Sequence, residues 1–109
     1  MYLHSGGKFD LGLDAESTDK KLSSDTIIIS VPTKYKDLYS LNSRTLVIDS
    51  DAKQKAAYTA LYALHHDIIK NLTVDNELRK VYKTASENFT QKAPDLVKFL
   101  PKEFGFGIG

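Results

Sequence analysis

The stretch Thr26-Ile27-Ile28-Ile29-Ser30-Val31 is rich in β-branched residues and is apolar at positions that would face both sides of a sheet. This composition is typical of a central strand. Pro32 follows directly and cannot donate a hydrogen bond to a neighbouring strand, so we expect the strand to end or bulge there. Residues 35–41 and 45–48 predict two further strands, which we expect to be antiparallel neighbours.

An alternating pattern precedes this strand. Phe9, Leu11 and Leu13 are separated by single polar or glycine residues, and this period of two predicts a strand over residues 9–13 with one buried face. Residues 15–25 are polar and turn-prone, which predicts a long loop. The acidic positions in and around this loop are Asp14, Glu16, Asp19 and Asp25, and Lys20 and Lys21 interrupt them. We therefore expect a solvated connection and no strong acidic patch.

The second half of the chain changes to a helical period. Asp49-Ser50-Asp51 offers an N-cap, and an apolar stripe follows at Ala57, Leu61, Leu64, Ile68 and Leu72. Asp75 predicts the cap of a second helix, whose inner face would carry Leu78, Val81, Tyr82, Ala85 and Phe89. Pro94 suits the first turn of a short third helix that Pro101 ends, and residues 104–109 predict a glycine-rich strand.

These elements predict an α+β fold with an antiparallel sheet, two long helices and one short helix. The glycine-rich strand would need a partner and a continuation, and the first residue stands just before a strand. We therefore expect residues 1–109 to be part of a single domain that is truncated at both ends. The alternative is a complete small α+β domain with a loose tail.

Composition excludes several classes of function. The chain has 109 residues and a formal net charge of +1, which gives no global attraction to nucleic acid or to an anionic membrane. We expect no specific DNA binding and no membrane association from this segment. Its apolar runs are far too short to span a bilayer, and its start lacks the pattern of a signal peptide. The absence of cysteine excludes disulfides.

Three local motifs resemble functional sites, but each is better interpreted as ordinary structure. The glycines at 105, 107 and 109 lack the spacing and the following helix of a dinucleotide-binding loop. His65 and His66 would point about 100° apart on a helix and cannot easily share one metal ion, so we expect one to edge the core and the other to be solvated. Lys34 to Lys36 with Tyr39 form a basic and aromatic cluster, interpreted as a solvated strand surface, with a binding patch as the alternative.

Several segments in this order resemble the pita-bread fold of methionine aminopeptidase, aminopeptidase P, prolidase and creatinase. They are residues 26–31, 35–45 and 47–49, the two helices, and Gly105-Phe106-Gly107-Ile108-Gly109. Within this group the chain is most similar to the peptidase-like N-terminal domain of the large-subunit family of FACT, a nuclear histone chaperone. Residues 4–11, 34–36, 43–49 and 92–96 carry that closer resemblance.

The resemblance implies where metal ligands would stand. Active members of the fold bind two metal ions through two aspartates, one histidine and two glutamates. Counted back from Arg44-Thr45, the aspartate positions are Leu41 and Ser30, the histidine position is Phe106, and the glutamates would lie beyond Gly109. A slip that made Asp37 a ligand would disrupt the match at Arg44-Thr45. Leucine and phenylalanine have no donor atom and serine is a poor ligand, so we expect no metal, no cofactor and no catalytic residue.

The resemblance also implies a function. We expect a non-catalytic, peptidase-like module in the nucleus, bound to chromatin, that holds histones H3–H4 or other chromatin proteins while nucleosomes are reorganised in transcription, replication and repair. The small subunit of FACT would be bound through other domains of the parent protein. Two alternatives stay open, a structural docking domain of a chromatin complex and an active pita-bread metallopeptidase. The sequence does not indicate which surface binds the partner.

Overall fold

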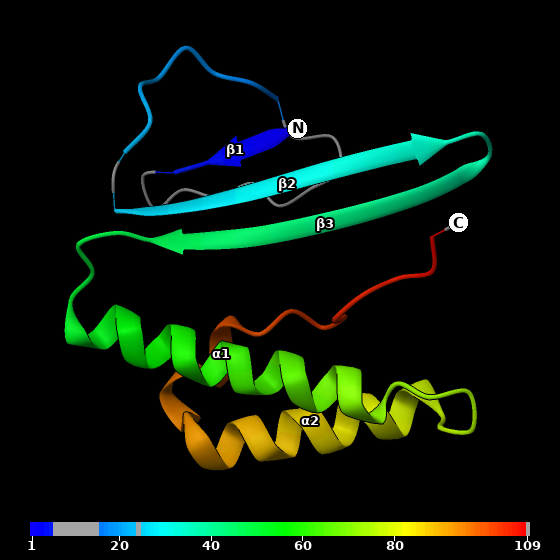
Figure 1. Ribbon diagram of the computed structural model, residues 1–109. Coiled ribbons are helices and arrows are strands. Elements are labelled where there is room, and N and C mark those ends of the chain that lie inside the picture. Colours follow the sequence, from blue (N-terminus) through cyan, green and yellow to red (C-terminus); the bar gives the residue numbers. More distant parts are fainter. Residues whose placement is uncertain (6–15, 24, 109) are drawn as a thin grey trace. The chain divides into compact units, whose positions relative to one another are not determined.

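The computed structural model in Figure 1 describes residues 1–5, 16–23 and 25–108. The chain divides into two compact units. The sheet unit comprises Met1–Ser50 with Gly107–Gly109, and the helical unit comprises Asp51–Phe106. Three antiparallel strands and three helices confirm the expected α+β class. The strand expected over residues 9–13 lies outside the described residues.

The sheet unit contains β1 (Tyr2–His4), β2 (Thr26–Tyr35) and β3 (Leu38–Val47), in the order β1-β2-β3. The strand built on the isoleucine run is therefore central among the described strands, as predicted. β1 pairs with it only from Ile28 to Ser30, whereas β3 pairs along its whole length. The β2–β3 hairpin consequently continues well beyond β1 (Figure 1).

The prediction that the strand ends or bulges at Pro32 was wrong, because β2 runs through it to Tyr35. Tyr35 and Leu38 flank a two-residue loop, and such flanking pairs are hydrogen-bonded. Alternation along the ladder then makes Pro32 and Leu41 a non-hydrogen-bonded pair, so the proline nitrogen points away from β3. β1 ends its pairing at Ser30, so Pro32 has no described strand on that side to which it should donate.

The prediction of separate strands over 35–41 and 45–48 was also wrong. A single strand, β3, covers residues 38–41 and 45–47 of these regions, whereas Tyr35 ends β2 and residues 36 and 37 form the hairpin loop. Lys36 has a φ of 54° there, in the left-handed region that glycine and asparagine adopt more readily. Neither Lys36 nor Asp37 is the usual glycine of a tight hairpin, so the turn carries no obvious sequence signal.

The helical unit contains α1 (Ala52–Asn71) and α2 (Leu78–Lys92), which lie side by side and run in opposite directions (Figure 1). Its core is small and consists of Leu64, Val81, Ala85 and Phe89. Each large apolar side chain that is fully buried contributes roughly 1.5–3 kcal/mol. The predicted inner faces were too wide, because Leu61 of α1, Leu72 at its C-cap, and Leu78 and Tyr82 of α2 are exposed. The contact between two helices covers only part of each apolar stripe.

The predicted caps had different outcomes. The Asp51 carboxylate accepts a hydrogen bond of 2.7 Å from the backbone N–H of Gln54, as expected for an N-cap. Asp75 does not cap α2, since Glu77 occupies the N-cap position and makes no side-chain capping bond. The turn before α2 is held instead by Asn76, whose side-chain amide donates to the Asn71 carbonyl at 2.9 Å.

A short 3₁₀ helix, η1 (Pro94–Phe99), follows α2 and begins at Pro94 as predicted. The predicted strand over residues 104–109 was wrong for its described part, because residues 104–108 pair with none of the described strands. Phe104 instead packs its ring 4.6 Å from that of Tyr82 and joins the helical core. No helix in the described part of the chain is both long and apolar enough to cross a membrane.

Candidate functional site

The sheet brings together two of the three positions singled out in the sequence. Ser30 on β2 lies opposite Ser43 on β3, and Pro32 lies opposite Leu41. Side chains alternate along a strand, so these four residues share one face, which we call the serine face. Ser30 and Leu41 are diagonal neighbours on it, a relationship that typically separates Cβ atoms by about 7 Å. Carboxylates at these two positions could reach a common metal centre.

The side chains present do not fit a metal. The Ser30 hydroxyl is within 2.8 Å of the Ser43 hydroxyl, so the two groups satisfy each other. Leu41 is half-buried and offers no lone pair. The described strands carry no aspartate, glutamate or cysteine, and His4 is their one residue with a common metal-binding side chain. The described residues contain no group of three or more histidine, cysteine, aspartate or glutamate side chains that could hold a metal ion.

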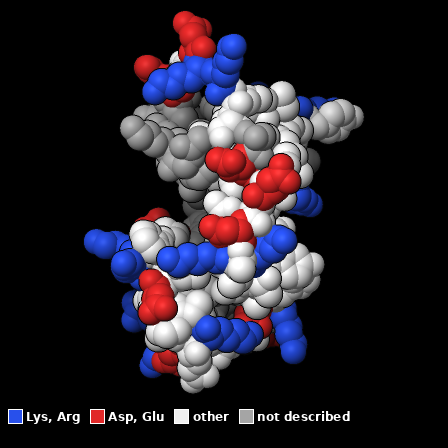
Figure 2. Space-filling view, turned by 90° about the vertical axis from the view of Figure 1, so that its left-hand side faces the viewer, with Lys and Arg blue, Asp and Glu red and all other residues white. Residues whose placement is uncertain are grey.

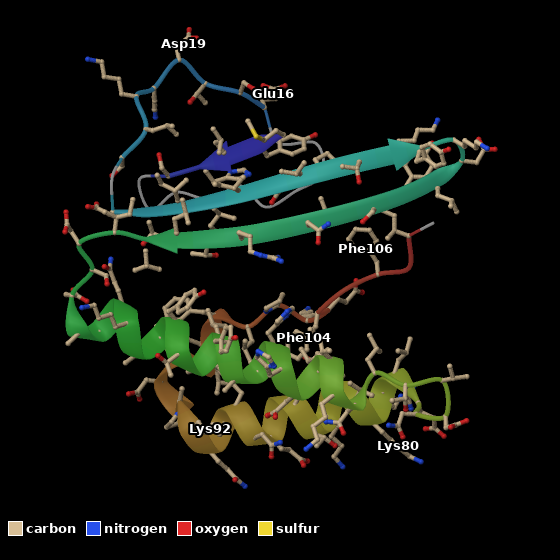
Figure 3. The ribbon with its side chains drawn as sticks, viewed as in Figure 1. Glu16, Asp19, Lys80, Lys92, Phe104 and Phe106 are labelled. Carbon is tan, nitrogen blue, oxygen red and sulfur yellow. The ribbon has the colours of Figure 1, made fainter. Side chains whose placement is uncertain are left out.

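The third position, Phe106, belongs to the helical unit and is 61% exposed. Figure 3 shows it on the C-terminal tail, near Phe104. The two phenylalanines differ in environment, because Phe104 packs against the helical core whereas Phe106 is absent from that cluster. A phenylalanine ring, like the leucine side chain, has no donor for a divalent metal.

The alternative ligand Asp37 lies in the hairpin loop, beyond the last strand pair. Asp37 precedes Leu41 by four positions, which corresponds to about 13 Å along an extended strand. Its position therefore disfavours a register in which Asp37 replaces Leu41 at the diagonal site next to Ser30.

The paired histidines form no site. His65 and His66 lie on α1 with ring centroids 6.3 Å apart and nearly perpendicular ring planes. The prediction that one of them edges the core was wrong, because both are exposed and Leu64 occupies the buried position beside them. His66 packs on Tyr62 at 4.5 Å, which gives it a structural contact on the helix surface.

The loop before β2 agrees with the expected solvated connection over its described residues. Glu16 and Asp19 are exposed and are spread along the loop (Figure 3). The loop is held near its end by Ser23, whose backbone N–H donates to the Ser5 hydroxyl at 2.9 Å. On the face of the molecule drawn in Figure 2, acidic and basic side chains are interspersed, and they form no large patch of a single charge.

Two features of the sheet were missed by sequence reasoning. The strand β1 places Tyr2 directly opposite Ser30 and His4 two residues further along the same face. Three residues are too few to display a period, so no hydrophobic pattern predicts this strand. The second feature is the register itself, which depends on the two-residue loop at Lys36 and Asp37.

Comparison with known proteins gives matches over nearly the whole chain. The family model "Metallopeptidase family M24" matches residues 4–109. The FACT complex subunit SPT16 of Dictyostelium discoideum is 35% identical over 108 residues, which is 98% of this chain and 10% of that protein. SPT16 of Zea mays is 37% identical over 108 residues, again 10% of its length. The chain thus spans about a tenth of the length of these curated relatives.

Solved structures agree with the sequence matches. The N-terminal domain of FACT complex subunit SPT16 from chickpea superposes with a TM-score of 0.92 and 39% identity, covering 98% of this chain and 26% of the solved chain. The corresponding domain from Eremothecium gossypii gives a TM-score of 0.88 and 31% identity, covering 98% of this chain and 25% of the solved one.

Proposed function

The chain belongs to metallopeptidase family M24, and we propose that it is a non-catalytic, peptidase-like module of a histone chaperone. Its fold is part of a pita-bread fold, and its similarity to SPT16 N-terminal domains extends over 98% of its residues. The observation that carries the proposal is the serine face, where the paired hydroxyls of Ser30 and Ser43 stand beside Leu41. Metal-activated water is the nucleophile in this chemistry, and this face offers nothing to hold the metal.

The proposed partners are histones H3–H4 or other chromatin proteins, bound during nucleosome reorganisation in transcription, replication and repair. The proposed location is nuclear chromatin. The small FACT subunit would be engaged by other parts of the parent protein, and this segment would make no specific contact with DNA. The matches to FACT complex subunits and the chain's net charge of +1 support these assignments. We also propose that residues 1–109 are part of a single larger peptidase-like domain, which the 26% coverage of the chickpea chain supports.

Metal binding is tested by elemental analysis of the larger parent domain, which includes the glutamate positions expected beyond Gly109, after incubation with manganese, zinc or cobalt and dialysis. The expected result is less than a tenth of an equivalent of metal and no cleavage of short peptides by the loaded protein. One or two bound equivalents together with peptidase turnover would restore the active-metallopeptidase alternative.

Histone binding is tested by calorimetric titration of H3–H4 into the larger parent domain at low and high salt. If the serine face makes the contact, binding should survive high salt and Leu41→Ala should weaken it severalfold, because the substitution removes about three carbon atoms of apolar contact. Leu46→Ala is the matched control, since Leu46 lies on the same strand but on the opposite face and is 46% exposed. Absence of binding at both salt concentrations would favour the docking-domain alternative.

A further inference from the structure

The end of the β2–β3 hairpin stands out from the rest of the sheet. We call Lys34, Tyr35, Lys36, Leu38 and Tyr39 the hairpin tip. β1 pairs only as far as Ser30, so none of the described strands flanks β2 here. Tyr35, Leu38 and Tyr39 are 72%, 67% and 48% exposed. Tyr35 and Leu38 therefore form a small exposed apolar surface on one side of the tip, and Tyr39 is exposed on the other side.

Each lysine of the tip lies over an aromatic ring. The Lys34 Nζ is 5.1 Å from the ring centroid of Tyr39, its cross-strand partner, and the Lys36 Nζ is 5.6 Å from that of Tyr35. Cation–π contacts of this kind contribute roughly 0.5–1 kcal/mol at exposed sites and hold the side chains in defined positions. The tip therefore presents two ammonium groups on two partly ordered aromatic rings.

Neither Lys34 nor Lys36 has an ion-pair partner among the described residues. The ion pairs found within the described residues are Glu77–Lys80 and Lys83–Glu87, and neither involves the sheet. Lys34 and Tyr39 lie on one face of the hairpin, while Tyr35 and Leu38 lie on the other. A partner that engages both lysines must contact both sides of the hairpin.

Strand addition at the β2 edge is hindered at the same place. The backbone groups of Pro32 point toward the open edge, where a non-proline residue would offer an N–H. The tip is consequently better suited to recognition by side chains than to pairing with another strand along this edge.

We propose that the hairpin tip docks an acidic segment of a partner protein whose carboxylates pair with Lys34 and Lys36 and whose apolar side chains pack on the exposed rings. Lys34 and Tyr39 lie on the serine face, next to Pro32 and Leu41, so the tip adjoins the proposed histone contact, but its two lysines would repel strongly basic histone tails and favour an acidic partner. It also fits nucleic acid poorly. It carries only two cations, with Asp37 in the loop beside them, whereas binding to a phosphate backbone typically uses several cations.

The test uses the 109-residue chain and a fluorescein-labelled peptide of ten residues in which glutamate alternates with leucine or phenylalanine. Fluorescence anisotropy at low salt gives the Kd. The double substitution Lys34→Ala and Lys36→Ala should weaken binding about two- to thirtyfold, the expected effect of losing two exposed ion pairs. Lys20→Ala with Lys21→Ala is the control, because it removes the same charge from exposed loop positions of the same unit and should change the Kd less than twofold.

Two further measurements complete the test. Tyr35→Ala with Tyr39→Ala keeps every charge and should still weaken binding of the acidic peptide. A peptide with glutamine in place of glutamate should bind the unaltered chain at least as weakly as the acidic peptide binds the double lysine variant. Far-UV circular dichroism verifies that each variant remains folded, and Lys34→Gln with Lys36→Gln replaces the alanine variant if it does not. Equal losses in the tip and control variants would refute the proposal, and so would an oligothymidine that binds the same lysines as tightly as the acidic peptide.

Discussion

Replacement of Phe89 by alanine tests whether the helical unit depends on the small core described above. Phe89 is 2% exposed and packs in one cluster with Leu64 and Ala85. Phe→Ala substitutions in cores typically cost about 3–5 kcal/mol, which combines lost burial with the cavity that remains. The expected total stability of a domain is only about 5–15 kcal/mol. Phe89→Ala should therefore remove a large share of the stability of the helical unit.

Urea unfolding followed by circular dichroism at 222 nm measures this loss, because the helices dominate that signal. With an m value of about 1–3 kcal/mol/M, a loss of 3 kcal/mol lowers the urea midpoint by about 1–3 M. Phe99→Ala is the matched control, since Phe99 is 73% exposed and its replacement should cost about 0.5 kcal/mol or less. If Phe99→Ala destabilised the chain as strongly as Phe89→Ala, the assignment of the core would be wrong.

Three smaller effects follow from the backbone and its caps, each measured by thermal or urea unfolding. Asp51→Ala should cost about 1 kcal/mol because it removes the bond to Gln54, whereas Asp75→Ala should cost almost nothing because Asp75 is not the cap residue of α2. Lys36→Gly should stabilise the hairpin by about 0.5–1 kcal/mol, since the φ of 54° strains a lysine; a loss would show that the side chain matters more. Ser86→Ala should stabilise α2 by about 1 kcal/mol, because the buried hydroxyl makes no hydrogen bond and alanine is the better helix former. Unchanged stability in Ser86→Ala would indicate that water satisfies the hydroxyl.

The helices were the most predictable part of the fold. A period near 3.6 located both long helices, and Asp51 identified the start of the first. The sequence could not specify which residues of each stripe would be covered, because that depends on the neighbouring helix. Leu61 and Leu64 are both apolar, yet one is 49% exposed and the other 7%. Asp75 and Glu77 were similarly ambiguous, since the connection between the helices is stabilised by Asn76 and not by an acidic cap.

The sheet was harder to predict because its register depends on a turn without glycine. The isoleucine run identified β2, but Pro32 suggested an end that did not occur. A proline interrupts a strand only when its nitrogen faces a partner, and that direction is set by the loop at residues 36 and 37. The tail at residues 104–108 was wrongly predicted as a strand for the opposite reason. Its composition is strand-like, but a segment forms a strand only where a neighbouring strand pairs with it.

The candidate site was predicted as positions but not as geometry. Counting from Arg44 identified Ser30 and Leu41 through the family resemblance, and only the strand pairing places them on one face. The assignment of these positions and of Phe106 to former metal ligands stays a prediction. Their side-chain chemistry is nevertheless fixed by the sequence, since no arrangement of leucine and phenylalanine gives a ligand for a divalent metal.

The serine face also suggests why a module without metal would keep neutral residues at these positions. Two carboxylates on diagonal neighbours about 7 Å apart would repel each other by roughly 2 kcal/mol at an effective dielectric constant near 20. A bound metal would offset that repulsion, but without one it would weaken the pairing of β2 with β3. Serine and leucine remove the repulsion, and the hydroxyl pair at 2.8 Å adds a bond between the strands. On the proposed function, the same residues that leave this face without metal ligands therefore stabilise the hairpin, and they leave a surface without carboxylates on which a peptide could bind uncleaved.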